Sequence, residues 1–147
     1  MKPETRQGLA AASAVVLVAG VCLSSGRSEE DSAKWNVPTR EAERKNPVPA
    51  DAKSAAAGKA VYAKNCVLCH GPAGKGDGPK GRDLQPQPTD LTSSQVTAQS
   101  EGALYWKITT GRRPMPSFRK ELSDEDRWHL VNYIRSLGPA KQSGKKP

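Results

Sequence analysis

The sequence predicts an all-α fold in which three main helices are joined by long loops. Three segments, beginning near residues 52, 100 and 123, combine helix-forming composition or an apolar stripe with recognisable end signals. No segment shows the alternating pattern of a β-strand, and the chain has no internal repeat. Its 13 glycines and 12 prolines favour long irregular connections between the helices.

The first 26 residues have the three parts of a secretory signal peptide. Two basic residues precede an apolar run from Leu9 to Leu23, and small residues follow at 24–26. The run is shorter than the ~20 residues of a membrane-spanning helix, so a cleaved signal is favoured over an uncleaved anchor that would tether the protein. Lipidation of Cys22 after cleavage is a third outcome, although Val21 departs from the small residue expected before a lipidated cysteine. We therefore expect a periplasmic protein or one on the outer face of the cytoplasmic membrane.

Residues 27–50 change character abruptly. They mix charges of both signs with three prolines, and Trp35 is the only large apolar group. Such a segment has little to bury by itself. It is predicted to be either a flexible linker or an extended arm that wraps along the domain surface.

The first helix is predicted to begin near Ala52 or Ser54 and to run through Lys64. Its alanine-rich composition favours a helix despite Gly58, which costs about 1 kcal/mol inside a helix. Gly58 and Tyr62 are four residues apart and share a face. We expect another helix to approach closely at Gly58, with Tyr62 packed beside it.

The five residues Cys66-Val67-Leu68-Cys69-His70 form the pattern of c-type haem attachment. Two thiols can add to the two vinyl groups of one haem, and the adjacent imidazole can ligate its iron. A zinc site would need about four ligands, and the chain has only one further cysteine, Cys22, and one further histidine, His129. A thioredoxin-like redox motif would need a βαβ context that is absent. A large apolar cofactor would also compensate for the low content of hydrophobic (35%) and aromatic (5%) residues.

Two loops rich in glycine and proline follow this motif. Residues 71–79 cannot form regular structure and are expected to form a loop that packs closely against a flat group. Residues 84–91 form the second loop. A ligating imidazole nearly always donates its other N–H to an acceptor, and the carbonyls of Pro86 and Pro88 are both candidates.

Two further helices complete the fold. Ser100 is expected to cap a short helix that ends at Gly111, and Ser123 is expected to cap the last one, which ends at Gly138. Acidic residues stand in the first turn of the last helix, where the helix dipole favours them. The buried faces are predicted to carry Leu104, Tyr105 and Ile108 on the short helix, and Trp128, Leu130, Val131, Tyr133, Ile134 and Leu137 on the last one. The domain is placed at 51–138, followed by a polar tail over 139–147.

Elimination points to Met115 as the second axial ligand of a haem iron. Met1 and Cys22 belong to the signal segment, and His129 lies on the face of the last helix that should pack against the first helix. Met115 is then the only methionine of the mature chain, 45 residues after His70, and flanking prolines fix it in an extended, rigid position. A thioether ligand favours ferrous iron and suits reversible one-electron transfer.

Residues from about Ala52 to Leu137 resemble a small monohaem class I c-type cytochrome. The resemblance rests on Gly58 and Tyr62, the haem-attachment motif followed by Gly71, the Gly-Asp-Gly-Pro loop at 76–79, Met115 between prolines, and Leu130 with Tyr133. It implies the cytochrome c fold, with three to four helices and long loops around one covalent haem c, and the first and last helices crossing near Gly58. It also implies thioether links at Cys66 and Cys69, axial ligands His70 and Met115, and no catalysis.

The predicted function is single-electron transfer between extracytoplasmic or membrane redox partners. A formal net charge of +8 favours negatively charged partners, and five basic residues are expected to form a rim that docks acidic redox proteins, including a membrane respiratory complex: Lys75, Lys80, Arg82, Arg112 and Arg113. Nucleic-acid binding is not expected, because the basic residues are scattered and aromatics are few. The alternatives are a haem peroxidase or gas-binding protein with a labile sixth ligand, and a haem-linked sensor served by another chain.

Overall fold

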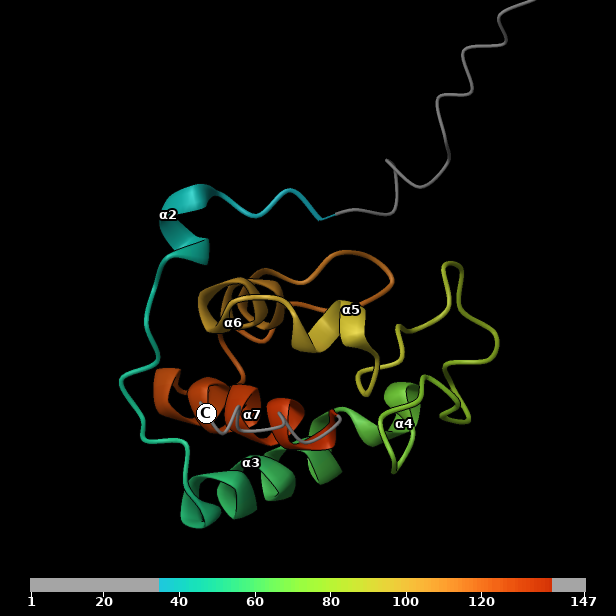
Figure 1. The fold of residues 1–147 in the computed structure, drawn as a ribbon. Helices are drawn as coiled ribbons and strands as arrows, with labels where there is room; N and C mark the ends of the chain where they lie inside the picture. The colour runs from blue at the N-terminus through green and yellow to red at the C-terminus, as the bar shows by residue number, and fades with distance from the viewer. Residues whose placement is uncertain (1–34, 139–147) are drawn as a thin grey trace, which may run out of the picture. The chain divides into compact units, whose positions relative to one another are not determined.

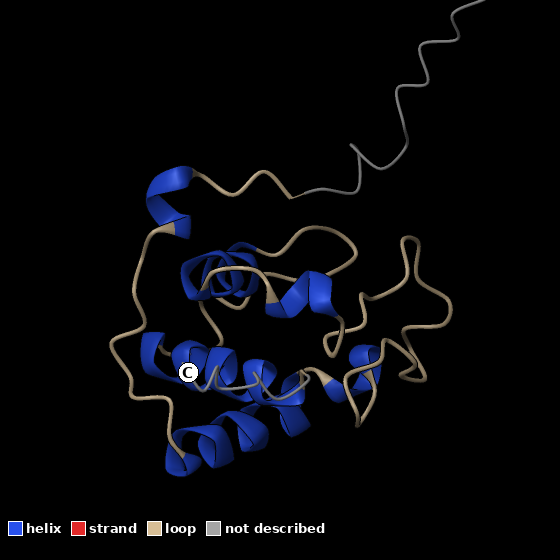
Figure 2. Cartoon of the chain, viewed as in Figure 1, coloured by secondary structure: helices blue, strands red, loops and turns tan. Residues whose placement is uncertain are grey.

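The computed structural model of the chain describes residues 35–138, which fold into helices joined by loops (Figure 2). The six helices of this part are α2 (Thr39–Ala42), α3 (Ala52–Asn65), α4 (Val67–His70), α5 (Ser94–Thr97), α6 (Glu101–Thr110) and α7 (Asp124–Leu137). Residues 35–138 contain no strand beyond one isolated bridge, so the all-α prediction is confirmed. The expected signal segment with Cys22 and the polar tail over 139–147 lie outside the described residues. None of the described helices is long and apolar enough to span a membrane.

The three long helices are the three that the sequence predicts, and each begins with a side-chain cap. Asp51 accepts a hydrogen bond from the backbone N–H of Ser54 at the start of α3 (2.7 Å). Ser100 and Ser123 cap α6 and α7 in the same way, as expected. These bonds pair backbone donors that a helix start otherwise leaves open.

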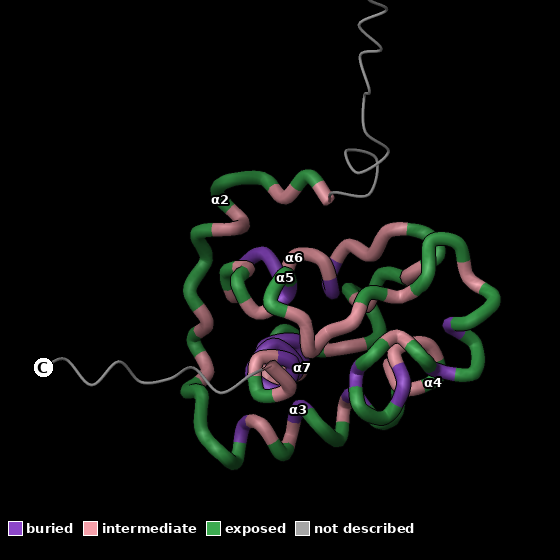
Figure 3. Tube along the Cα trace, turned by 45° about the vertical axis from the view of Figure 1, so that its right-hand side comes forward, coloured by how far each residue is buried: buried purple, intermediate pink, exposed green. Residues whose placement is uncertain are grey.

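α7 lies between α3 and α6 (Figures 1 and 3). At the crossing with α3, a Cβ atom added to Gly58 would lie 2.1 Å from the carbonyl oxygen of His129, so only glycine allows this approach. Tyr62 is 1% exposed, and its ring lies 5.2 Å from that of Tyr133. The expected crossing of the first and last helices at Gly58 is therefore present.

An aromatic stack joins α6 to α7. The rings of Tyr105 and Trp128 lie nearly parallel with centroids 3.9 Å apart. The fully enclosed part of the core is centred on α7, where Leu130 is 1% and Val131 0% exposed. Burial of large side chains at these positions contributes to the hydrophobic stabilisation of the domain.

Residues 35–50, the described part of the segment before the first long helix, lie along the surface of the domain. Trp35 makes an edge contact with Trp106 of α6 at 6.3 Å between ring centroids. The carbonyls of α2 approach Gly102, where a Cβ atom would lie 2.2 Å from the oxygen of Glu41. Farther along, Asn46 donates a hydrogen bond to the side chain of Asn132 in α7 (2.8 Å). The packed unit therefore begins at Trp35.

Candidate haem site

The Cys-x-x-Cys-His motif is wound into the single turn that continues from α3. The N–H of Cys66 bonds to the carbonyl of Tyr62 (2.9 Å), and the N–H groups of Cys69 and His70 both bond to the carbonyl of Cys66 (3.1 and 2.9 Å). Both cysteine side chains are half-buried. Burial, with a smaller contribution from Cys69, raises the pKa of the Cys66 thiol to about 12.

The imidazole of His70 is oriented through one of its two nitrogens. Its Nδ1 lies 3.3 Å from the carbonyl oxygen of Thr89, and because a carbonyl only accepts, Nδ1 carries the proton. Burial lowers the pKa of His70, while the bond to Thr89 acts in the opposite direction. The ring is thus neutral with Nε2 as its lone-pair nitrogen, which is the form that ligates a metal.

The acceptor of this bond corrects the sequence-based expectation of Pro86 or Pro88. The carbonyl of Pro88 faces the preceding loop instead, where a Cβ atom on Gly76 would lie 2.1 Å from its oxygen. The N–H of Leu91 bonds to the carbonyl of Gly74 (2.7 Å) and ties the same segment to that loop. With Pro88 directed at the loop, the next carbonyl, that of Thr89, faces His70.

The glycine-rich loop at residues 71–79 covers the end of α4. The N–H groups of Gly76, Gly78 and Lys80 bond to the carbonyls of His70, Cys69 and Leu68, at 2.8, 3.2 and 2.8 Å. These are carbonyls that the end of a helix leaves unpaired. The loop therefore fixes the backbone that carries the second thiol and the imidazole.

Tyr62 of α3 is hydrogen-bonded to the start of this loop. Its hydroxyl donates to the carbonyl of Gly71 (2.7 Å), and burial raises the pKa of Tyr62, which keeps the hydroxyl protonated. The sequence predicts Tyr62 only as a packing residue. The structure adds a link between α3 and the residue directly after the motif.

Met115 lies in the connection between α6 and α7, at residues 111–122, called the Met loop below. The N–H of Arg112 bonds to the carbonyl of Met115 (3.0 Å), and the N–H of Met115 bonds back to Arg112 (2.8 Å). This closes a tight turn, which restrains Met115 in addition to the flanking prolines. The side chain is half-buried and packs against the main core cluster, as Cys66 and Val67 also do.

A cavity of about 750 Å³ opens beside this turn, lined by Gln85 and residues 110–117. Cys66, Cys69 and His70 are not among its lining residues, so this cavity adjoins only the Met115 side of the candidate site. Two thiols, an imidazole with its Nε2 lone pair and a half-buried thioether are the donors that c-type haem requires. The residues present therefore fit the group, whereas residues 35–138 hold no cluster of three or more His, Cys, Asp or Glu side chains for a metal ion.

The expected basic rim is largely exposed. Lys75, Lys80, Arg82 and Arg113 are all solvent-exposed, whereas Arg112 is half-buried and its guanidinium lies 5.3 Å from the centre of the Trp35 ring. Among the large hydrophobic residues of the described part, the exposed one is Leu68 of the attachment motif, which has 53% of its surface exposed.

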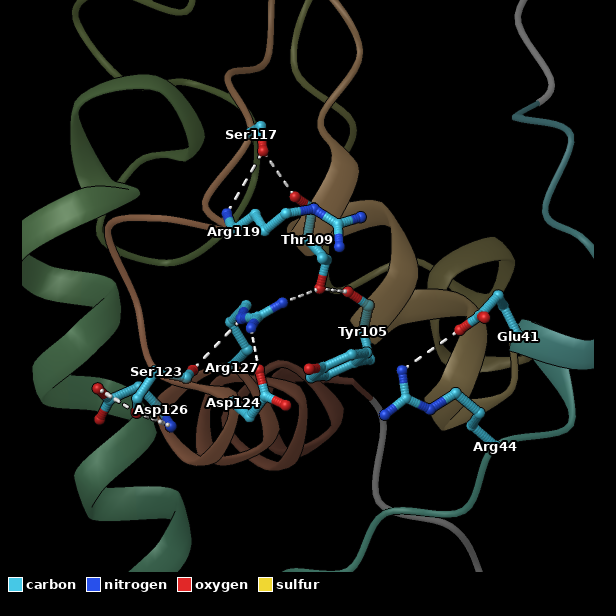
Figure 4. A network of polar contacts seen from close by, with 10 residues as sticks. All are labelled: Glu41, Arg44, Tyr105, Thr109, Ser117, Arg119, Ser123, Asp124, Asp126 and Arg127. Carbon is cyan, nitrogen blue, oxygen red and sulfur yellow. Dashed lines mark hydrogen bonds and ion pairs between the residues drawn. The ribbon is translucent and has the colours of Figure 1, made fainter.

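Sequence reasoning missed two residues that position this site. One is Thr89, and no spacing rule separates its carbonyl from its neighbours. The other is Arg127, which is 4% exposed and lies at the centre of a polar network at the base of the Met loop (Figure 4). A signal for Arg127 was present, because it stands three and four residues before Leu130 and Val131 on the buried face of α7.

Comparisons with known proteins agree on one family. The family model described as cytochrome C oxidase, cbb3-type, subunit III matches residues 53–134. A cbb3-type cytochrome c oxidase subunit CcoP from Azospirillum brasilense is 34% identical over 92 residues, which is 62% of this chain and 31% of the relative. Cytochrome c6 from Picosynechococcus sp. is 35% identical over 88 residues, covering 58% of this chain and 75% of the relative.

A solved structure shares the fold. A chain of the Kuenenia stuttgartiensis reducing HAO-like protein complex superposes with a TM-score of 0.57 and 36% identity, over 63% of this chain and 47% of the other. The present chain spans about a third of the length of the oxidase subunits that it matches.

Proposed function

The chain belongs to the family described as cytochrome C oxidase, cbb3-type, subunit III, and it is therefore a class I c-type cytochrome with one covalent haem c that acts in electron transfer. We propose that His70 and Met115 together hold the haem iron. Membership of this family confirms the expected fold and cofactor. When bound, the haem supplies a reversible one-electron couple. The surrounding residues of the chain would hold the two ligand side chains in place and limit access to the iron.

The observation that carries the proposal is the bond from His70 Nδ1 to Thr89. It sets the tautomer and leaves Nε2 as the ligating atom. Cys66 and Cys69 lie on the same turn, and we assign the two thioether links to them. Met115, held by its turn beside the cavity, is the remaining donor.

Electron transfer is favoured over peroxide or gas chemistry by the position of the second histidine. Peroxide chemistry needs an acid–base group near an open iron position. His129 instead bonds through Nδ1 to the Ser54 hydroxyl (2.8 Å) at the α3–α7 crossing. With His70 and Met115 both serving as ligands, the iron would have no open position for substrate.

The ferric spectrum of the full-length protein tests this ligand set. We expect the weak far-red band of methionine–iron bonding in the wild type and its loss in Met115→Ala. Leu122→Ala is the matched control, because Leu122 is a half-buried apolar residue of the same loop that packs on the same core. A high-spin ferric spectrum in the wild type would refute the assignment and favour the enzyme alternative.

We further propose that the protein works outside the cytoplasm. The segment over 1–26 would direct export or act as a membrane tether, the arm would follow, and 51–138 would be the cytochrome domain. The relatives named as cbb3-type oxidase subunits suggest a membrane respiratory complex as a partner. The exposed rim of Lys75, Lys80, Arg82 and Arg113 supports docking to an acidic surface.

Salt dependence tests this docking. Electron-transfer rates with an acidic redox protein should fall as ionic strength rises, because exposed charges are screened beyond about 10 Å at 0.1 M salt. Arg113→Glu should lower the rate at low salt, whereas Lys59→Glu on the exposed face of α3 should change it little. Rates that do not vary with ionic strength would exclude a role for the basic rim.

A further inference from the structure

The buried arginine at the start of α7 is an unusual residue for its position. Within residues 35–138, Arg127 is the one Lys, Arg, Asp or Glu side chain classed as buried. A buried guanidinium is costly unless it is fully hydrogen-bonded. Its acidic partner, Asp124, is 75% exposed, so the charge is not neutralised by a second buried group. The position of Arg127 therefore calls for an explanation from its other contacts.

Those contacts join the two ends of the Met loop (Figure 4). Nη1 donates to the Thr109 hydroxyl in the last turn of α6 (2.5 Å), just before the loop begins. Nε donates to the carbonyl of Ser123, directly after the loop ends (3.3 Å), and Nη2 pairs with Asp124. One planar guanidinium thus links the helix that enters the loop to the helix that leaves it.

Thr109 extends this link toward Met115. Its hydroxyl donates to the carbonyl of Tyr105 (2.7 Å), which leaves lone pairs for Arg127. Its carbonyl accepts from the hydroxyl of Ser117, two residues after Met115 (2.7 Å). The next residue, Phe118, bonds through its N–H to the carbonyl of Ile108 (3.2 Å). The segment following Met115 is therefore attached to the end of α6 that Arg127 holds.

We propose that Arg127 is a positioning residue that closes the base of the Met loop and keeps Met115 on the iron. The inference rests on the proposed function, since it takes Met115 as the sixth ligand. A guanidinium suits the role because its donors are fixed in one plane and can span two chain ends at once. A lysine at this position keeps the charge but presents a single ammonium group.

A second arginine provides a matched control. Arg44 of the arm places its guanidinium 4.7 Å from the centre of the Tyr105 ring, while that of Arg127 lies 4.9 Å from the same ring. Arg44 pairs with Glu41 at the surface and has no hydrogen bond to the Met loop. Comparing the two residues separates the loop contacts from the contact with the aromatic ring.

The test measures how readily added imidazole displaces Met115 from ferric iron in the full-length, haem-loaded protein. In Arg127→Met and Arg127→Lys the affinity for imidazole should rise by about tenfold, the effect of losing a hydrogen bond to a charged group. Amide hydrogen exchange should increase within residues 111–122. Arg44→Met should leave both readouts at wild-type values. If Arg127→Met does not fold, Thr109→Val removes the hydroxyl that accepts from Arg127, together with its bond to the carbonyl of Tyr105, and should give the same two changes.

Two results would overturn the inference. One is wild-type imidazole affinity and loop exchange in both Arg127→Lys and Thr109→Val, and the other is an equal effect of Arg44→Met. A wild-type protein that already lacks the far-red band would reject Met115 as ligand, and the role of Arg127 with it. A normal band in the wild type with unchanged variants rejects the role of Arg127 alone.

Discussion

The α3–α7 crossing and the haem-side loops both depend on a glycine that approaches a carbonyl oxygen, yet for different reasons. A Cβ atom would lie 2.1 Å from His129 O at Gly58 and 2.1 Å from Pro88 O at Gly76. Gly58 stands inside a regular helix, where only the neighbouring helix forbids a side chain. Gly76 has a φ of 80°, so its own backbone conformation also excludes other residues.

The two regions also bury different parts of the chain. At the crossing, large side chains such as Tyr62 and Val131 are enclosed between helices. In the loop at residues 71–79, the buried positions are glycines, and the stability comes from backbone hydrogen bonds. Buried backbone contributes little apolar surface, so the loops should depend more than the crossing on the haem that they would surround.

Removal of the haem attachment gives the largest expected effect. Cys66→Ala combined with Cys69→Ala should leave a largely unfolded domain without a cooperative thermal transition, because so small a core needs an additional staple. Calorimetry and circular dichroism of the purified variant would measure this. A sharp transition in the variant would show that the crossing holds the fold without haem, and would sharpen the contrast between the two regions.

Gly58→Ala should have the next largest effect. Helix propensity alone predicts a gain of about 1 kcal/mol, but the clash with His129 O should give a net loss of about 1–3 kcal/mol. Chemical denaturation measures the change, and the haem spectrum should change little because neither Gly58 nor the His129 carbonyl is a proposed haem ligand. Ala60→Gly at an exposed position of α3 is the control and should cost about 1 kcal/mol. A stabilised Gly58→Ala variant would contradict the close approach of the two helices.

Gly76→Ala should have a smaller effect on stability, but the effect should reach the haem. The left-handed conformation costs an alanine about 1–2 kcal/mol, and displacement of Pro88 should move the Thr89 carbonyl away from His70. We expect a shifted reduction potential, measured by redox titration. Gly71→Ala has a similar φ of 76° but meets the movable side chain of Asp77. Equal shifts in both variants would mean that backbone strain alone, without the Pro88 contact, accounts for the change.

The same contrast separates what the sequence predicts from what it does not. The caps Ser100 and Ser123 and the apolar stripe of α7 are local signals, so the three long helices were predictable to within a residue or so, whereas the four-residue helices α2, α4 and α5 were not predicted. The bond from His70 to Thr89 depends on how one loop seats against another, and that is set by the approach of Pro88 to Gly76. Arg127 was overlooked because its charge favours a surface assignment, although its helical spacing places it inside.

The arm changes how an anchor at the N-terminus would act on the domain. Because Trp35 is already seated against Trp106, the chain between residues 35 and 50 offers no slack. Residues 35–50 would therefore add no free length to a tether at the N-terminus. Trp35 also lies against Arg112, the residue whose backbone pairs with Met115, so the start of the arm contacts the Met loop directly.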